Sequence, residues 1–214
     1  MCVPMLCTAL LAAPAAASPP PEAAISEARL LEAALEGIRG LVASFTQTVD
    51  SPALPAPQVE RGTVYMLRPG RMRWEYGEPP GKLAIADGRR TWLYLPEDRQ
   101  AIVAPLDLED PGPGMGLLMR PRVDLLREFR VAWGPPESGG SRPLMLTPRS
   151  SRAGYQHLLV LTDAEHLIRS LVVVDTLGGR TTYRFSRLRR LPDLDPSLFR
   201  FTVPEGIQVQ EVAR

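Results

Sequence analysis

Most of the chain alternates apolar and polar residues in short runs, and turn residues separate each run from the next. Alternation with a period of two is typical of β-strands that bury one face, and turns recurring about every 8–12 residues are typical of a sandwich or barrel. Turns such as ADGR, PEDR and LGGR connect the runs. The strands expected from this pattern cover residues 42–50, 59–68, 71–77, 82–87, 90–96, 99–105, 128–133, 142–148, 155–162, 166–175, 180–189 and 199–203.

One segment near the N-terminus has helical spacing instead. Between residues 26 and 40, Leu31, Leu35 and Ile38 share one stripe of a helix, and charged residues occupy most other positions. The same spacing continues through residues 42–49. However, two glycines favour a stop before that point, and the sequence LVASFTQTV is rich in β-favouring residues. We therefore expect the helix to end where this first strand begins.

A second segment, residues 106–129, also departs from the β pattern. It begins with a Pro- and Gly-rich stretch and continues with the runs MGLLM and VDLLREF, which predict one or two short helices. Residues 53–57 and 134–143 are rich in turn residues and are expected to form exposed loops.

The number of strands constrains the fold class. So many antiparallel strands do not remain flat, because strand twist makes a sheet of that size curl. Only one long helix and one or two short ones are available to cover the inside of the curl. We expect a mainly β fold with helices (α+β), in which a curved antiparallel sheet forms an unclosed barrel. An N-terminal helix and short lid helices would cover it.

Large apolar side chains recur on alternate positions of several expected strands. In residues 71–77 they alternate with charged ones, so this strand has one strongly apolar face. Any one of these side chains can fill an ordinary core, but together, on a curved sheet, they predict a concave apolar cavity. The residues expected to line it are Met72, Trp74, Tyr76, Leu83, Ile85, Trp92, Tyr94, Tyr183 and Phe185.

Composition narrows the function classes. The chain has 214 residues, enough for one sizeable domain, and its net charge of +1 provides no global field for nucleic acid. A nucleic-acid partner is therefore not expected. A local basic run at Arg187, Arg189 and Arg190 is most often a solvated strand end; the alternative is contact with an acidic partner or anionic headgroups.

The first residues have the features of an export signal. Residues 1–17 contain a short apolar run that ends in alanines, although no Lys or Arg precedes Arg29. We expect a signal peptide at 1–17, a linker at 18–25 and one domain at 26–210. Cys2 and Cys7 would be removed with the signal, and export without disulfides favours the periplasm.

Candidate catalytic chemistry is sparse. His157 and His166 lie on two strands of one expected hairpin, one far from its turn and the other near it, so they are not expected to share a metal ion. The sequence contains no HExxH motif, no nucleophile elbow and no phosphate-binding glycine loop. We therefore expect neither catalysis, nor a metal ion, nor a cofactor.

Four segments in order resemble the LolA family of periplasmic lipoprotein carriers. They are LVASFTQTV, RGTVYMLRPGRMRWEYGEPP, AIADGRRTWLYLPEDRQAIVAPL, and a C-terminal part that begins LTDAEHLIRSLVVVDTLGGRTTYRF and ends LDPSLFRFTVPEGIQV. The resemblance covers residues 26–210. It implies an unclosed barrel that binds the acyl chains of lipoproteins and acts as a monomer. It also implies that an inner-membrane ABC-type lipoprotein-releasing complex supplies the cargo and that an outer-membrane acceptor of the LolB type receives it.

The resemblance also implies roles for particular residues. Arg68, in the RPG turn, corresponds to the arginine that hydrogen-bonds the lid and governs closure. Met72 stands where the family usually has a cavity-lining phenylalanine, and Trp74 matches the family's tryptophan. In the lid segment, Leu117, Leu118 and Met119 would face the cavity. Two alternatives stay open: a carrier of the same fold for another amphiphile, such as a glycolipid or pigment precursor, and an envelope sensor or adaptor that binds without transfer.

Overall fold

The structure is a computed structural model in which one curved sheet of twelve strands is the main element. It describes residues 21–77, 80–108, 114, 116–120, 122–137, 139–151 and 153–212. The helices are α1 (Pro21–Glu36), α2 (Gly116–Met119), α3 (Leu125–Glu128) and the 3-10 helix η1 (Pro196–Phe199). The strands are β1 (Gly40–Asp50), β2 (Gln58–Leu67), β3 (Arg71–Tyr76), β4 (Leu83–Asp87), β5 (Arg90–Leu95), β6 (Gln100–Pro105), β7 (Phe129–Trp133), β8 (Leu144–Pro148), β9 (Tyr155–Thr162), β10 (Ile168–Asp175), β11 (Arg180–Arg190) and β12 (Gln208–Glu211).

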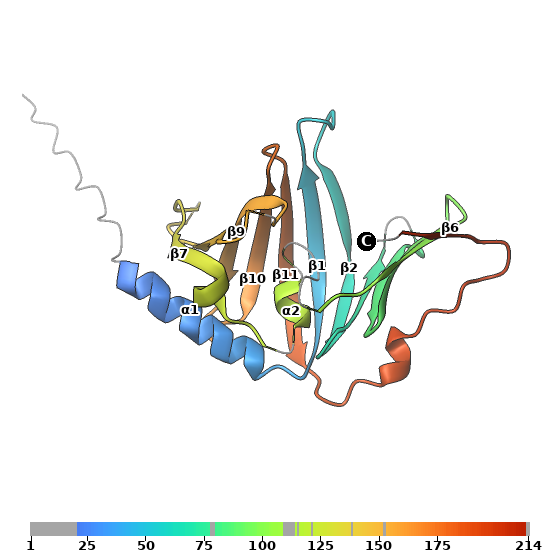
Figure 1. Cartoon of the computed structure of the whole chain (residues 1–214), viewed down its shortest axis with the longest axis horizontal. Helices are drawn as coiled ribbons and strands as arrows, with labels where there is room; N and C mark the ends of the chain where they lie inside the picture. Colours follow the sequence, from blue (N-terminus) through green and yellow to red (C-terminus); the bar gives the residue numbers. More distant parts are fainter. Residues whose placement is uncertain are drawn as a thin grey trace, which may run out of the picture.

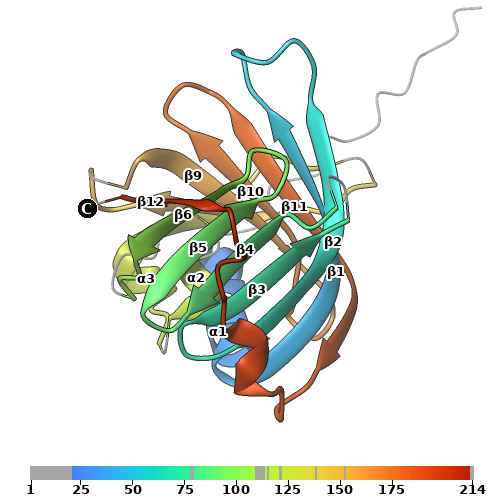
Figure 2. The same ribbon diagram turned by 90° about the vertical axis from the view of Figure 1, so that its right-hand side faces the viewer.

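The strand order makes the sheet an unclosed barrel. Along the sheet the order is β12-β6-β5-β4-β3-β2-β1-β11-β10-β9-β8-β7, so β12 and β7 are its two edges and do not pair with each other. Neighbours are antiparallel except β12, which runs parallel to β6. Figures 1 and 2 show the resulting curl from two directions. The expected fold class is confirmed: a large sheet with few helices bends into an open barrel.

Helix α1 packs on the concave side of the sheet. Ala24, Ala28, Leu31 and Leu35 recur at three- and four-residue spacing, and each is at most 1% exposed. The helix ends at Glu36, and β1 begins at Gly40. A Cβ atom on Gly40 would overlap the carbonyl oxygen of Leu191, so glycine is required where the chain turns into the sheet.

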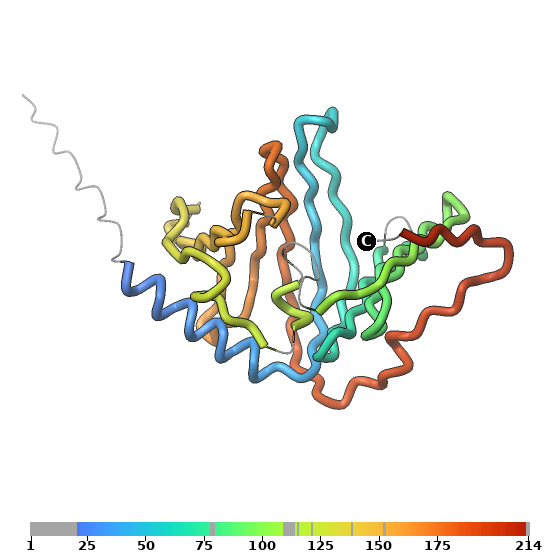
Figure 3. The backbone as a smooth tube through the Cα atoms, in the orientation of Figure 1, coloured from blue at the N-terminus to red at the C-terminus, as the bar shows by residue number. Residues whose placement is uncertain are grey.

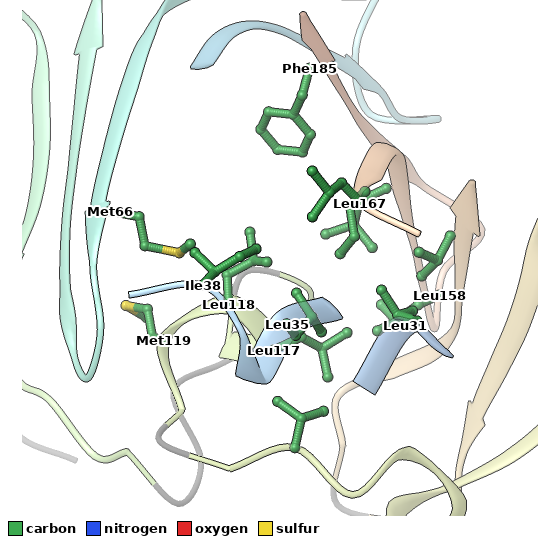
Figure 4. Close-up of a cluster of buried hydrophobic side chains, with 14 of the residues drawn as sticks. Leu31, Leu35, Ile38, Met66, Leu117, Leu118, Met119, Leu158, Leu167 and Phe185 are labelled. Carbon is green, nitrogen blue, oxygen red and sulfur yellow. The ribbon is translucent and has the colours of Figure 1, made fainter. Parts of the chain in front are cut away.

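The core therefore lies between the concave face and the helices. The register of β1 to β3 aligns Phe45, Val64 and Trp74 on one face, and aligns Met66 with Met72 next to them. All five are at most 6% exposed. In Figure 4 the side chains of α1, α2 and the sheet meet in this region.

The C-terminal segment follows a path that differs from the expectation. Residues 199–203 were expected to form a strand, but η1 ends at Phe199 and the chain then continues as an unpaired segment to β12. Figure 3 shows this segment, in red, passing along the outside of β3 to β6. Strand β12 has exposed side chains throughout, and it was not expected because it lacks a buried face. In the part of the chain that the structure describes, no helix has the length and apolar character needed to cross a bilayer.

Candidate functional site

The candidate site is the concave face together with α2, which we call the lid. The side chains of Leu117, Leu118 and Met119 are 4%, 7% and 6% exposed and belong to the same buried cluster as α1 and the inner face of the sheet. Figure 4 shows Leu117 beside Leu35 of α1, and Met119 facing Met66 of β2. The lid thus fills part of the concave space with its own apolar side chains.

The turn between β2 and β3 holds the lid. The guanidinium of Arg68 donates through Nε and Nη2 to the carbonyl oxygen of Arg120, with an Nε–O distance of 3.0 Å, and through Nη1 to the carbonyl oxygen of Leu35. The backbone N–H of Gly70 donates to the carbonyl oxygen of Met119 at 2.9 Å. One short turn therefore contacts both the end of α1 and the end of the lid.

These contacts follow from the chemistry of helix ends. The last carbonyl groups of a helix have no partner within the helix, and their partial negative charge attracts cations. Burial lowers the pKa of the Arg68 guanidinium, whereas the carboxylate of Glu36 opposes that shift. Arginine stays protonated at ordinary pH. The half-buried positive charge is therefore stabilised by the Glu36 carboxylate and by the carbonyl oxygens that the guanidinium bonds.

Behind the lid there is almost no free space. The cavity between α1, the lid and the sheet has a volume of about 20 Å³, which is room for about one water molecule. Met72 and Phe185 border it, together with Leu35, Ile38 and Leu118. In this closed arrangement, an acyl chain can enter only if the lid side chains move away.

A larger pocket adjoins the same residues on the other side of the lid. It has a volume of about 320 Å³ and is bordered by Met72, Trp74 and Met119. Residues of β4 to β6, including Ala84 and Ala86, form the rest of its wall. Ligand pockets usually start at about 300 Å³. Small side chains opposite Trp74 and Met72 leave this space open, because alanine fills little of the inner surface.

Aromatic rings form the floor beside this pocket. Trp74 contacts Phe45, Tyr183 and Phe185 with ring-centroid distances of 4.6, 5.5 and 6.2 Å. Tyr76 contacts Phe45 at 5.1 Å, and its hydroxyl donates to the side-chain oxygen of Gln47 at 3.0 Å.

Polar groups lie at the far end of the concave face. Burial raises the pKa of Tyr76 and of Tyr183, so both phenols stay neutral at physiological pH. Lys82 lies over the Tyr76 ring, 4.3 Å from its centroid, and pairs with Glu60 at 2.6 Å. The concave surface is therefore apolar near the lid and becomes polar toward the β1–β2 hairpin.

Four residues expected in the cavity lie on the opposite face. In the register, Leu83 pairs with Tyr94 and Ile85 pairs with Trp92, whereas Ala84 and Ala86 are the inward residues of β4. Phe201, from the C-terminal segment, packs on Trp92 and Tyr94 with centroid distances of 5.3 and 5.4 Å. Ile85 and Trp92 nevertheless border the 320 Å³ pocket, next to the inward residues of their strands. The expectation is thus corrected for Leu83 and Tyr94, which do not line the pocket. The rings of Trp92 and Tyr94 are covered on the convex side by Phe201 of the chain's own C-terminal segment.

Several lining residues were missed by the sequence reasoning. Phe45, Val64 and Met66 lie inward on β1 and β2, and Leu167 and Ile168 approach from the start of β10. The alternation in LVASFTQTV carried the signal for Phe45. The contribution of residues 167–168 depends on the turn before β10, which no periodicity reveals.

The two histidines are apart, as expected. His166 Nδ1 lies 3.0 Å from a carboxylate oxygen of Glu27 on α1, and the Thr162 hydroxyl donates to the same oxygen at 2.7 Å. His157 lies on β9, where burial and then the charge of Arg180 lower its pKa. Among the described residues, no group of three or more His, Cys, Asp or Glu side chains could hold a metal ion.

Comparison with known proteins identifies the family. The sequence profile of the outer membrane lipoprotein carrier protein LolA matches residues 36–202. The chain belongs to the LolA family. Relatives named outer-membrane lipoprotein carrier protein include one from Dechloromonas aromatica, 31% identical over 82% of this chain and 83% of its own length. Another, from Xylella fastidiosa, is 33% identical over 84% and 85% of the two chains.

Solved structures share the fold. An uncharacterized conserved protein from Thermus thermophilus is 18% identical, with a TM-score of 0.51 over 89% of this chain and 99% of its own. MucB is 14% identical, with a TM-score of 0.51 over 88% of this chain and 65% of its own. At these identities the likeness concerns the fold alone, so the LolA family assignment depends on the sequence match.

Proposed function

We propose that this protein carries lipoproteins between membranes by holding their acyl chains on the concave face of the sheet. The observation that supports this most directly is the lid, tied by Arg68 and Gly70 over an apolar surface beside a 320 Å³ pocket. Membership of the LolA family and relatives named lipoprotein carriers point to the same function. The protein acts as a carrier and not as an enzyme.

The energetics of transport explain why a lid is useful. Each methylene group moved from water to an apolar site contributes about 0.8 kcal/mol, so a sixteen-carbon chain left in water costs roughly 12 kcal/mol. A carrier must cover that surface during transit. When it is empty, the same apolar surface would favour aggregation. Leu117, Leu118 and Met119 cover it in the closed form, and incoming acyl chains replace them.

The lid contacts are of a suitable strength for reversible closure. Hydrogen bonds to a charged group contribute about 1.5–3 kcal/mol each. The few bonds made by Arg68 can therefore be outweighed by the burial of one acyl chain. No nucleotide is needed in the carrier itself, because loading can be driven by an ABC-type releasing complex in the inner membrane. Release then proceeds to a LolB-like acceptor at the outer membrane.

This proposal places the protein in the periplasm, with residues 1–17 acting as the export signal. Those residues lie outside the described part of the chain. We also propose that the carrier acts as a monomer, as the family resemblance implies.

The test is depletion of the protein in the bacterium that produces it, followed by separation of inner and outer membranes. We expect lipoproteins to accumulate in the inner membrane and to return to the outer membrane when the wild-type gene is restored. The acyl chains that co-purify with the protein should be covalently attached to lipoproteins. If lipoproteins are sorted normally and a lipid extract of the purified protein contains a glycolipid or another free amphiphile, the protein carries a different cargo. Stable binding of lipoproteins without transfer would show that the protein is a sensor or adaptor.

A further inference from the structure

The convex face of the three central strands carries an unusual set of side chains. On β2, β1 and β11 the outward positions alternate with the core positions described above, and they are mainly hydroxyl residues and arginines. The register aligns Thr46 with Arg61 on one side and with Arg184 on the other. These two arginines are therefore about 10 Å apart, two strand spacings, on either side of a threonine.

Two further arginines lie next to this row, where β11 is irregular. The pairing of β1 with β11 shifts between Val42 and Ser44, so β11 contains an extra residue at this point. Arg187 takes up the irregularity with a φ of 52°, a left-handed conformation that residues other than glycine rarely adopt. Arg189 follows, aligned with Val42. We call Arg61, Arg184, Arg187 and Arg189 the basic patch.

The irregularity opens a surface pocket of about 570 Å³. Arg187 and Arg189 border it together with Ser44, Thr63 and Tyr65, which carry three hydroxyl groups. The pocket therefore offers two guanidinium groups and several neutral hydrogen-bond donors on the outside of the sheet, whereas the LolA cavity is on the inside.

The positive charge of the patch is not neutralised locally. Within the described part of the chain, none of the four arginines forms an ion pair. Glu75, on the neighbouring strand β3, is aligned with Thr63 but is paired with Arg73 at 2.6 Å. The row that contains Val59, Thr48 and Thr182 has no carboxylate either.

Guanidinium groups and hydroxyls at this spacing fit phosphate oxygens. Arginine presents a planar fork of donors that matches phosphate geometry, and hydroxyl groups donate to the remaining oxygens. We propose that the basic patch docks the protein on the phosphate headgroups of an anionic bilayer, with one headgroup in the pocket beside Arg187 and others against Arg61 and Arg184.

A bilayer fits the observations better than a single small anion does. The arginines extend over three strands, so they can contact several headgroups at once. Docking through the convex face also leaves the lid and the concave pocket free, which a carrier that visits membranes requires. In that respect the inference rests on the proposed function, but its test needs no cargo.

The test is co-sedimentation of the protein, purified from the periplasm in its processed form, with cargo-free vesicles. Vesicles of phosphatidylglycerol and phosphatidylcholine are compared with vesicles of phosphatidylcholine alone. We expect binding to the anionic vesicles at low ionic strength and its loss as salt screens the charges. Each arginine near an anionic surface strengthens binding about fivefold, so the double variant Arg187→Gly/Arg189→Gln should bind roughly 25-fold more weakly.

A matched control removes the same charge elsewhere. Arg29 on α1 and Arg130 on β7 are exposed, and Arg29→Gln/Arg130→Gln should leave vesicle binding unchanged. Glycine tolerates a positive φ, so Arg187→Gly should not lower the denaturant midpoint, and loss of binding cannot then be attributed to misfolding. Equal losses in both double variants would overturn the proposal, because net charge alone would explain the binding.

Two other results would also overturn it. Inorganic phosphate could bind in titration calorimetry while vesicles do not, which would make the pocket a site for a soluble anion. Alternatively, polyglutamate could bind to the basic patch while phosphatidylglycerol vesicles do not, which would make the patch a protein-docking surface. The depletion experiment measures lipoprotein sorting, and its result does not depend on whether the purified protein binds vesicles. The two proposals can therefore fail independently.

Discussion

The Nε atom of Arg68 lies 3.0 Å from the carbonyl oxygen of Arg120, 52 residues further along the chain. The same side chain donates to the carbonyl oxygen of Leu35, 33 residues earlier. A turn between two strands thus joins the helix that covers one part of the concave face to the lid that covers another. We propose that these bonds break when the lid opens, so that Arg68 links lid position to the occupancy of the cavity.

Replacing Arg68 should favour the open lid. Arg68→Leu removes the donors to both carbonyl groups, which stabilises the open form by roughly 3 kcal/mol relative to the closed one. We expect normal folding and loading but slow handover of lipoprotein to the acceptor, because closure no longer helps to expel the cargo. The measurement is transfer from purified carrier to acceptor membranes. Amide exchange at residues 116–120 should also become faster.

Arg68→Lys is the control for this experiment. It keeps the charge but cannot bond both carbonyl groups in the same planar geometry. Intermediate transfer is expected, and transfer by Arg68→Leu at the wild-type rate would show that the lid bonds do not control release.

A charge at Met72 should interfere with loading. The side chain is 2% exposed and borders both the small cavity and the 320 Å³ pocket. A carboxylate there must be desolvated when acyl chains bind, and such a group costs several kcal/mol without a partner. We expect Met72→Glu to reduce the lipoprotein that co-purifies with the carrier by at least tenfold. Val59→Glu, on an exposed outward position, should have no effect; equal loading of Met72→Glu and wild type would remove Met72 from the site.

Filling the pocket should separate cargo binding from stability. Ala84 is an inward residue opposite Trp74 at the wall of the 320 Å³ pocket. Ala84→Leu adds apolar volume to existing space, so the free energy of unfolding should change by less than about 1.5 kcal/mol while cargo loading falls. The readouts are a denaturant titration and co-purification of lipoprotein. Thr48→Leu on the convex side is the control, and unchanged loading with Ala84→Leu would indicate that acyl chains bind elsewhere.

The packing of Phe201 on Trp92 and Tyr94 predicts an effect on stability and none on cargo loading. Phe201→Ala removes one ring that contacts both of them. Aromatic pairs contribute about 0.5–1.5 kcal/mol each beyond burial, so the free energy of unfolding should fall by about 1–3 kcal/mol. Acyl-chain loading should not change, because Phe201 itself does not border the cavity or the pocket. Reduced loading with unchanged stability would show that Trp92 and Tyr94 contribute to cargo binding.

The turn before β10 should make the fold sensitive to acid. Partial burial acts to raise the pKa of Asp163, but hydrogen bonds from the N–H groups of Leu167 and Glu165 and the charge of Arg169 outweigh it, so the pKa is lowered. A lowered pKa means that this carboxylate stabilises the fold above its unfolded-state pKa and that the contribution disappears as pH falls through the folded-state value.

Asp163→Asn tests this directly. The variant should have a lower denaturant midpoint than wild type at pH 7, and the difference should shrink as pH falls through the carboxylate range. A constant difference at all pH values would show that charge at Asp163 does not matter. Because Leu167 and Ile168 border the cavity, the same titration reports on the support of one of its walls.

Local pattern predicted most of the elements. The alternation in residues 71–77 placed Met72, Trp74 and Tyr76 on one face, and the register shows them together on the concave side. The helical stripe of Leu31 and Leu35 predicted a buried helix, and both residues are buried. The boundary near Gly40 was also anticipated, because glycine favours a change of structure and close packing against Leu191 requires it.

The alternation of apolar and polar residues did not predict the orientation of β4 and β5, because both faces of these strands carry apolar residues. Strands β4 and β5 carry their largest residues outward, and the inward positions of β4 are alanines. Periodicity shows which residues share a face but not which face is inside. Here the C-terminal segment supplies a second apolar layer through Phe199 and Phe201, which reverses the usual rule that the larger side chains face the main core.

The amino-acid sequence by itself determined the strand-rich composition, the single N-terminal helix, the alternation that gives each strand an apolar face, and the family. These properties depend on residues that are close together in the chain, where backbone geometry sets the period. Only the tertiary structure decided which face of β4 and β5 is concave and how Arg68 reaches Leu35 and Arg120. It also decided that four arginines, which form no ion pair with any described residue, gather on the convex side. These relationships join residues far apart in the chain, and they arise from strand register and from the curvature of the whole sheet.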